Sequence, residues 1–186
     1  MASLFVITGP SGVGKGTLIA RLRDRFPELE LSVSATTRRP RPDERDGVAY
    51  HFMTPEQFDA HARAGEFLEH ATYSGNRYGT LRSEVDRRLE AGRPVVLEIE
   101  VEGARQVREA MPDAVAVFIA PPGPEALRER LEARGTDNPD QVDARLRTAE
   151  RELEAQSEFP HVVVNDDLDA ASDELARIVG AALDGR

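Results

Sequence analysis

The chain of 186 residues has no cysteine, and only one of its 24 lysine and arginine residues is a lysine, Lys15. The absence of cysteine excludes disulfides and thiol chemistry and is compatible with a reducing compartment, so we expect a cytoplasmic protein. No apolar run approaches the roughly 20 residues that a membrane span needs. The apolar opening MASLFVIT has no basic stretch before it and ends at a glycine loop, which indicates a buried strand and not a signal peptide.

The chain also lacks a net positive charge: its formal net charge is −10 at pH 7. This balance disfavours a nucleic-acid-binding surface, although local arginine clusters can still hold small anions. We therefore expect small-molecule substrates and no nucleic-acid or membrane partner. The length suffices for one full hydrophobic core with small insertions, and the sequence leaves open whether the chain is a monomer or a homo-oligomer.

Apolar runs alternate with amphipathic stretches along the chain. Runs rich in β-branched residues predict buried strands at 4–8, 95–99, 114–119 and 161–164. Helical spacing of apolar residues predicts helices at 17–26, 81–91, 103–111, 125–134, 141–155 and 170–183. This alternation predicts an α/β fold with a parallel sheet and helices on both faces.

Two excursions interrupt the alternation. Residues 33–81 combine a strand-like start, an arginine- and proline-rich loop, a capping box that begins at Thr54, and further strand with a turn at 74–77. These features predict a small mixed insertion beside the main sheet. Residues 125–155 predict a helical hairpin that would act as a lid. The predicted core domain then comprises residues 1–32, 82–124 and 156–186.

The segment GPSGVGKGT follows the first predicted strand and precedes a helix. Its glycines let backbone N–H groups converge on an anion, and the helix N-terminus adds partial positive charge. The ammonium of Lys15 is compact enough to reach β- and γ-phosphates, whereas the planar fork of an arginine is larger. A chance glycine-rich turn is the alternative, which the order of strand, loop, lysine and helix disfavours. The predicted triphosphate-binding residues are Gly9, Pro10, Ser11, Gly12, Val13, Gly14, Lys15, Gly16 and Thr17.

The loop departs from the general phosphate-binding pattern at one position. The pattern G-x-x-x-x-G-K continues with Ser or Thr, but here Gly16 follows Lys15 and the hydroxyl arrives at Thr17. Thr17 is therefore the candidate magnesium partner on this loop. The pattern alone indicates a nucleoside triphosphate and leaves the second substrate open.

A second group of basic residues lies in SATTRRPRPDERDGVAY, at Arg38, Arg39 and Arg41. Arginine forks together with the phenol of Tyr50 suit a phosphate monoester. The alternative is a solvated charged loop, which most charge runs are.

Five segments together resemble one known family. GPSGVGKGT, SVSATTRRPR, FLEHATYSGNRYGT, APP…LRERLEARGT and VVVNDDLD are similar to guanylate kinase, and the resemblance runs over residues 4–183. It implies a P-loop NTPase-type fold and an enzyme that phosphorylates GMP, and also dGMP, with MgATP by direct in-line transfer in purine nucleotide metabolism. Several of these motifs are particular to the family, so they are more specific than the phosphate loop.

The resemblance also implies a GMP site. Its phosphate-binding residues would be Arg38, Arg41, Tyr50 and Tyr78, and its guanine-binding residues would be Ser34, Glu69, Thr80 and Glu100, with Gly79 beside them. Guanine presents donors at N1 and N2, which one carboxylate accepts together, whereas adenine presents neither. Taken alone, Glu69 would be a solvated glutamate of an edge strand, and only its place within FLEHATYSGNRYGT supports the assignment.

The acidic positions in VVLEIEVEG depart from the family, which usually has aspartate at both. By resemblance Glu98 would act near magnesium, directly or through water, and Glu100 near guanine. Each extra methylene pushes the carboxylate outward by about one bond length. Two outward-facing glutamates are the alternative, which we disfavour because residues i and i+2 of a strand share a face and this strand is otherwise apolar.

Arginines are frequent in 125–155, and many of them are partners of glutamates on exposed helix faces. The resemblance singles out Arg134 and Arg145 for closing over the triphosphate. The predicted catalytic set is Lys15, Arg41, Arg134 and Arg145. Arg130 would join them or pack against adenine, and Asn165 would lie at the adenine edge or close a strand-end turn.

Two other functions are compatible with the same scaffold. A kinase of a ribose bisphosphate would need no guanine reader, which Glu69 and Thr80 argue against. The other alternative is a guanylate-kinase-like domain that binds peptides and has lost catalysis. Such domains usually have an eroded phosphate loop, whereas this sequence keeps Lys15, Arg38, Arg41, Arg134 and Arg145.

Overall fold

The computed structural model describes residues 3–73, 75–133 and 139–185. Five strands form the main sheet in the order β2-β7-β1-β8-β9, and every pair of neighbours is parallel. Their bounds are Leu4–Thr8 (β1), Glu30–Leu31 (β2), Val95–Glu98 (β7), Val115–Ala120 (β8) and His161–Val164 (β9). The predicted α/β fold with a parallel sheet is confirmed.

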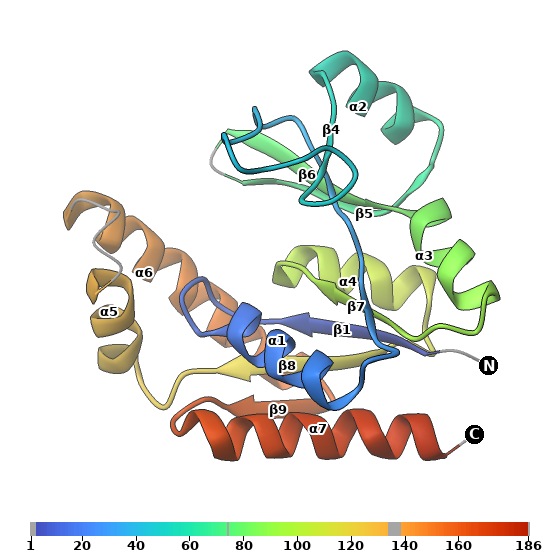
Figure 1. The fold of residues 1–186 in the computed structure, drawn as a ribbon. Coiled ribbons are helices and arrows are strands. Elements are labelled where there is room, and N and C mark those ends of the chain that lie inside the picture. The colour runs from blue at the N-terminus through green and yellow to red at the C-terminus, as the bar shows by residue number, and fades with distance from the viewer. Residues whose placement is uncertain (1–2, 74, 134–138, 186) are drawn as a thin grey trace.

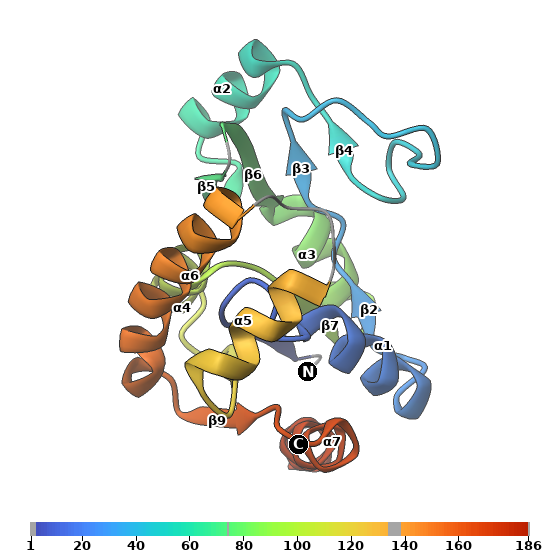
Figure 2. The ribbon, with the colours of Figure 1, turned by 90° about the vertical axis from the view of Figure 1, so that its left-hand side faces the viewer.

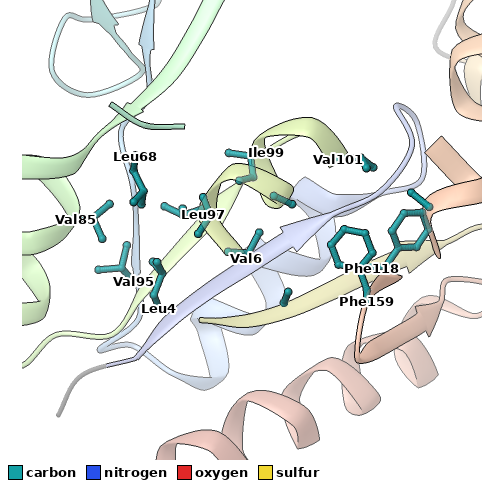
Figure 3. Close-up of a cluster of buried hydrophobic side chains, with 14 of the residues drawn as sticks. Leu4, Val6, Leu68, Val85, Val95, Leu97, Ile99, Val101, Phe118 and Phe159 are labelled. Carbon is teal, nitrogen blue, oxygen red and sulfur yellow. The ribbon is translucent and has the colours of Figure 1, made fainter. Parts of the chain in front are cut away.

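Helices cover both faces of this sheet (Figure 1). Alternate residues of β1 point to opposite faces, so Phe5 and Ile7 pack with α1 and α7, whereas Leu4 and Val6 pack with α3 and α4. Figure 3 shows the second of these clusters, which Phe118 and Phe159 extend. The helix bounds are Lys15–Arg25 (α1), Arg82–Glu90 (α3), Val101–Ala110 (α4) and Leu168–Asp184 (α7).

A second, four-stranded sheet with mixed strand directions stands above the main sheet in Figure 1. Its order is β4-β3-β6-β5, with bounds Ala35–Thr36 (β3), His51–Phe52 (β4), Phe67–Tyr73 (β5) and Asn76–Leu81 (β6). Helix α2, Pro55–Arg63, packs on it through Phe58, which stacks on Phe67. The predicted capping box is confirmed, since Thr54 and Gln57 bond reciprocally at the start of α2.

The strand-like stretch that begins near residue 31 divides between the two sheets. Glu30 and Leu31 pair with β7 of the main sheet, and Ala35 and Thr36 pair with β4 and β6 of the second. The connecting residues 32–34 therefore lead from one sheet to the other, a division that local apolar pattern does not reveal.

The remaining helices form a hairpin at one end of the molecule, seen face-on in Figure 2. They are α5, Pro124–Ala133, and α6, Pro139–Glu154, followed by the short 3-10 helix η1, Ala155–Glu158. They bury a small cluster of their own, formed by Leu127, Leu131, Val142, Leu146 and Ala149. The sequence also predicts a polar tip for this hairpin at 135–139, which lies outside the described residues except for Pro139. None of the described helices combines the length and apolar character needed to cross a bilayer.

Candidate active site

The polar residues of the site gather at the carboxyl edge of the main sheet. β1 leads directly into the glycine loop, β7 ends at Glu98, and β9 is followed by Asn165. Because all five strands are parallel, these three ends meet at the same edge, on either side of the point where the strand order reverses.

Glycine is required where the loop passes close to the neighbouring strand. Gly9 has φ 138°, and a Cβ there would lie 2.2 Å from the carbonyl oxygen of Ile119 in β8. Gly14, with φ 99°, is the residue that precedes α1, and no side chain caps this helix. The N–H groups of the first turn of α1 therefore stay open to an anion.

Lys15 lies beside this loop with only 8% of its surface exposed. Its ammonium nitrogen Nζ donates to the carbonyl oxygen of Gly9 and to that of Pro10 at 3.2 Å. Two neutral carbonyls are weak partners for a nearly buried ammonium, so an incoming phosphate group would be a stronger one.

A cavity of about 380 Å³ connects the loop with the second sheet. The predicted loop residues that line it are Pro10, Ser11, Gly12, Gly14, Lys15 and Gly16. On the other side it is lined by the predicted residues Ser34, Tyr50, Glu69, Tyr78, Gly79, Glu98 and Glu100. The structure thus brings most members of two distant sequence motifs to a single cavity.

Glu69 is a buried carboxylate at the far end of this cavity, 5% exposed. Thr80 donates to it from its hydroxyl, at 2.6 Å from Oε1, and from its backbone N–H. Burial nevertheless raises the pKa of Glu69 to about 7, and the nearby Glu100 carboxylate raises it as well. Thr80 lies behind Glu69 and acts on the cavity through it.

Glu98 and Glu100 do not share a face of one strand, so that prediction was wrong. β7 ends at Glu98, and Glu100 is the N-cap residue that precedes α4. Glu98 is exposed at the strand end, and its carboxylate oxygens lie 3.8 Å from the position of a Cβ on Gly16. Glu100 is half-buried farther along the cavity wall. The strand was predicted too long because Ile99 and Val101 continue the apolar pattern into the helix.

Glu44, which the sequence did not single out, holds the segment 38–46 together through hydrogen bonds; we call this segment the arginine loop. The Arg38 guanidinium donates to both Glu44 oxygens, at 2.7 and 2.9 Å, and lies over the ring of Tyr50 at 5.3 Å. Tyr50 meets Tyr78 edge-on, and burial raises the pKa of the Tyr50 phenol, which therefore remains a donor. Arg41 is exposed, and its backbone N–H donates to Glu44.

A smaller cavity of about 220 Å³ lies on the other side of the loop. Asn165 is buried there, and its amide donates to the carbonyl oxygen of Val13 at 2.8 Å. The guanidinium of Arg130 donates to the carbonyl oxygens of Asn165, at 2.7 Å, and of Val13. Both residues thus brace the loop and line this cavity, together with Thr17. Arg145 lines neither cavity, and Arg134 lies outside the described residues.

The two predicted magnesium partners lie at different cavities. Glu98 lines the larger one and Thr17 the smaller one. Among residues 3–73, 75–133 and 139–185 no three His, Cys, Asp or Glu side chains gather into a ready metal site. An oxygen ligand at Glu98, beside the loop, fits the way Mg²⁺ is usually held, by one or two carboxylates plus substrate phosphates.

Besides Glu44, sequence reasoning missed a second acidic residue of the site, Glu152 on α6. It accepts the backbone N–H of Ser11 and lies within hydrogen-bonding range of Glu100. Burial and then Glu100 raise the pKa of Glu152 to about 8, while Lys15 acts in the opposite direction. The sequence carries no signal for it, because its partners Glu100 and Ser11 are distant along the chain and only the fold brings them together.

Comparisons with known proteins agree on one family. The model of the guanylate kinase family matches residues 1–182. The chain is 54% identical to a guanylate kinase of Synechococcus sp. (strain CC9311) over 92% of this chain and 90% of that protein. It is 52% identical to one of Thermobifida fusca (strain YX) over 96% of this chain and 91% of that protein. The crystal structure of guanylate kinase from Anaplasma phagocytophilum matches with a TM-score of 0.75 at 30% identity, covering 97% of this chain and 86% of that one.

The pKa of Glu69 predicts a pH dependence of stability. The folded-state pKa is about 7 against an ordinary value of 4.5, so between these values the folded chain holds a proton that the unfolded chain has lost. The free energy of unfolding should therefore fall as pH rises from about 4.5 to 7, by roughly 3 kcal/mol from this group. Urea unfolding at pH 5 and pH 8 measures it. The Glu69→Gln variant should lose this part of the fall, and an identical pH dependence in both proteins would contradict the assignment.

Proposed function

The chain belongs to the guanylate kinase family, which converts GMP and ATP into GDP and ADP, and we propose that the larger cavity is where the two nucleotides meet. A single observation supports this proposal: Lys15 on the phosphate loop and the buried carboxylate of Glu69 line the same cavity. A cationic, N–H-rich end suits phosphates, and an acidic end suits the donor edge of guanine. We further propose that dGMP is accepted and that the enzyme acts in cytoplasmic purine nucleotide metabolism.

Guanine binds at the Glu69 end in this proposal. Its N1–H and N2–H₂ groups donate to the Glu69 carboxylate, and Ser34 and Glu100 lie on the same cavity wall to contact the base. Adenine has no N1 donor and no 2-amino group, so it would leave a buried carboxylate without its partner. A site built around a hydrogen-bonding group can discriminate by about 10⁴-fold for this reason.

The GMP phosphate binds between the base and the loop. Tyr50 and Tyr78 line this part of the cavity, and the Arg38 guanidinium is already oriented by Glu44 and Tyr50. Arg41 reaches the phosphate from the exposed side when the arginine loop moves inward. Phenols and guanidinium forks are the donors that a phosphate dianion prefers.

ATP binds along the glycine loop. Its phosphates take the open N–H groups before α1 and the ammonium of Lys15, which leaves its two carbonyl partners. The smaller cavity beside Arg130 and Asn165 accommodates the adenine. Arg145, on α6, and Arg134 close over the triphosphate.

In this proposal Glu98, which lines the larger cavity, is the residue that would hold Mg²⁺, whereas Thr17 lines the smaller cavity on the other side of the loop. When bound to ATP, Mg²⁺ neutralises charge on the β- and γ-phosphates. Glu98 would hold it from the end of β7 through a carboxylate oxygen.

The transfer itself is a direct displacement. An oxygen of the GMP phosphate attacks the γ-phosphorus of ATP in line, and the bond from that phosphorus to the β,γ-bridging oxygen breaks, which leaves ADP. No general base is needed, because the attacking phosphate is largely ionised near neutral pH. The protein aligns the two nucleotides and stabilises the negative charge with Lys15 and the arginines. Closure of the insertion (residues 33–81) and of the helical hairpin over the cavity excludes water from the γ-phosphate.

Phosphate transfer from MgATP to GMP, with AMP and a sugar phosphate as competing acceptors, tests this function. We expect GDP as the product, no comparable transfer to the other two acceptors, and only slow hydrolysis of ATP when GMP is left out. Rapid ATP hydrolysis in the absence of GMP would contradict the proposed closed, water-free transfer.

Replacing Lys15 tests the phosphate end. Lys15→Met should lower kcat by about 10²–10³-fold or more, since it removes a charge that stabilises the transferring group, and GMP affinity should change little. Arg21→Met is the matched control, because Arg21 lies on the same helix but pairs with Asp169 at the surface. Steady-state kinetics and GMP titration calorimetry measure both quantities, and wild-type turnover in Lys15→Met would disprove the role of Lys15.

Measuring GMP binding at different pH values tests the guanine end. If GMP needs the ionised form of Glu69, whose pKa is about 7 in the free protein, GMP should bind about tenfold more weakly at pH 6 than at pH 8. The GMP phosphate also titrates in this range, and Glu69→Gln isolates that contribution. Equal pH dependence in the wild type and in Glu69→Gln would show that Glu69 does not titrate on GMP binding.

A further inference from the structure

The strand that carries Glu69, β5, is hydrogen-bonded to α4, a helix that packs on the main sheet. β5 is an edge strand of the four-stranded sheet, so one of its sides has backbone groups that no neighbouring strand pairs. At His70, the side chain of Gln106 on α4 forms hydrogen bonds with both of these backbone groups. Its Oε1 accepts from the His70 N–H at 3.0 Å, and its Nε2 donates to the His70 carbonyl oxygen at 3.0 Å. One side-chain amide thus takes the place of a paired strand, immediately next to Glu69.

A glycine on the same helix sets the distance between α4 and the carboxylate. A Cβ at Gly103 would lie 2.5 Å from Oε2 of Glu69, so no larger residue fits without moving Glu69. Gly103 and Gln106 are three residues apart and therefore neighbours on one face of α4. Because Thr80 holds the other carboxylate oxygen, Glu69 is enclosed between α4 on one side and β6 on the other.

The residue before Glu69 is also anchored in the main core. The pairing register of β5 and β6 shifts between Phe67 and Glu69, which marks a bulge. Leu68, within the bulge, lies in the same buried cluster as Val85 and Leu97, as Figure 3 shows. Leu68 and the His70 backbone are therefore both attached to the core side, and Glu69 lies between the two attachments.

We propose that Gln106 is a positioning residue for guanine recognition, which fixes the Glu69 carboxylate relative to α4 and so sets both the affinity for GMP and the preference for a purine that carries a 2-amino group. The proposal rests on the proposed role of Glu69 in binding guanine. α4 begins at the end of β7, so this bond also ties the base-binding end to the part of the site that bears Glu98. Guanine recognition then stays fixed to the main sheet while the arginine loop is free to move.

A purely stabilising role for Gln106 makes different predictions. Loss of two hydrogen bonds between α4 and β5 would lower the stability of the whole fold and would affect GMP and ATP alike. A positioning role changes only what depends on the Glu69 carboxylate. Inosine monophosphate separates the two, because it keeps the N1 donor of guanine and lacks the 2-amino group, so it is insensitive to the second contact.

The experiment compares Gln106→Leu, which keeps the size and removes both hydrogen bonds, with Glu109→Gln on the exposed side of the same helix. Gln106→Leu should lower kcat/KM for GMP about tenfold, leave KM for ATP within about twofold, and lower the preference for GMP over inosine monophosphate about threefold or more. Glu109→Gln should match the wild type. Gln106→Glu, which still accepts from the His70 N–H and cannot donate to its carbonyl, should be intermediate, and it decides the question if Gln106→Leu does not fold.

Glu69→Gln and the double variant Glu69→Gln/Gln106→Leu distinguish the ways in which the proposal can fail. With the carboxylate gone, removing Gln106 should cost no further selectivity. If Glu69→Gln loses selectivity while the Gln106 variants keep it, the positioning role is wrong and the proposed function stands. If Glu69→Gln itself keeps the preference for GMP, the proposed guanine reader is wrong and the role of Gln106 falls with it. If the Gln106 variants lose affinity for GMP and for ATP to the same extent, Gln106 has only a structural role and the positioning role is wrong.

Discussion

Burial of the Glu69 carboxylate is the constraint on which the rest of the site depends. A carboxylate 5% exposed needs hydrogen-bond donors, and in this structure the donors to it come from Thr80. The pKa of Glu69 is raised because the donors from Thr80 do not compensate for burial of the carboxylate. The donors that would complete the site are two adjacent N–H groups in a plane, which a guanine edge supplies and an adenine edge does not. In the proposed function, selectivity for guanine arises because only that purine supplies the donors that Glu69 can accept.

The opposite end of the cavity has the opposite requirement, and the two together orient the nucleotide. Lys15 is 8% exposed and donates to carbonyl oxygens, and the first turn of α1 has no side-chain cap. This end supplies ammonium and N–H donors, whereas the Glu69 end supplies carboxylate acceptors. A molecule with an anion at one end and an N–H edge at the other can satisfy both only in one direction. In the proposed function, this polarity turns the GMP phosphate toward the loop and the base toward Glu69.

The parts that the sequence predicted are those that short segments determine. Strands, helices and the glycine loop follow from local pattern, and Gly9 is required by a contact that its motif already implies. Glu98 and Glu100 were placed on one strand because apolar residues continue past the strand end into α4. Glu44, Gln106 and Glu152 were missed, since each acts on a residue brought near by the fold: Arg38, the backbone beside Glu69, and Glu100. A residue whose function is to hold another has no signature of its own in a single sequence.

Glu152 shows why the two ends cannot be treated separately. Its Oε2 and that of Glu100 are buried, and no donor among the described residues reaches either atom, although the two carboxyl groups are within hydrogen-bonding range. Two carboxylates so placed repel unless they share a proton, which agrees with the pKa of Glu152 at about 8. Glu152 also accepts the Ser11 N–H of the phosphate loop, and Arg145 lies two turns away on the same helix. In the proposed function, a movement of α6 that brings Arg145 toward the triphosphate would also move Glu152 relative to Glu100. Closure over ATP would then be linked to the electrostatics of the proposed guanine-binding end, because one helix carries both Arg145 and Glu152.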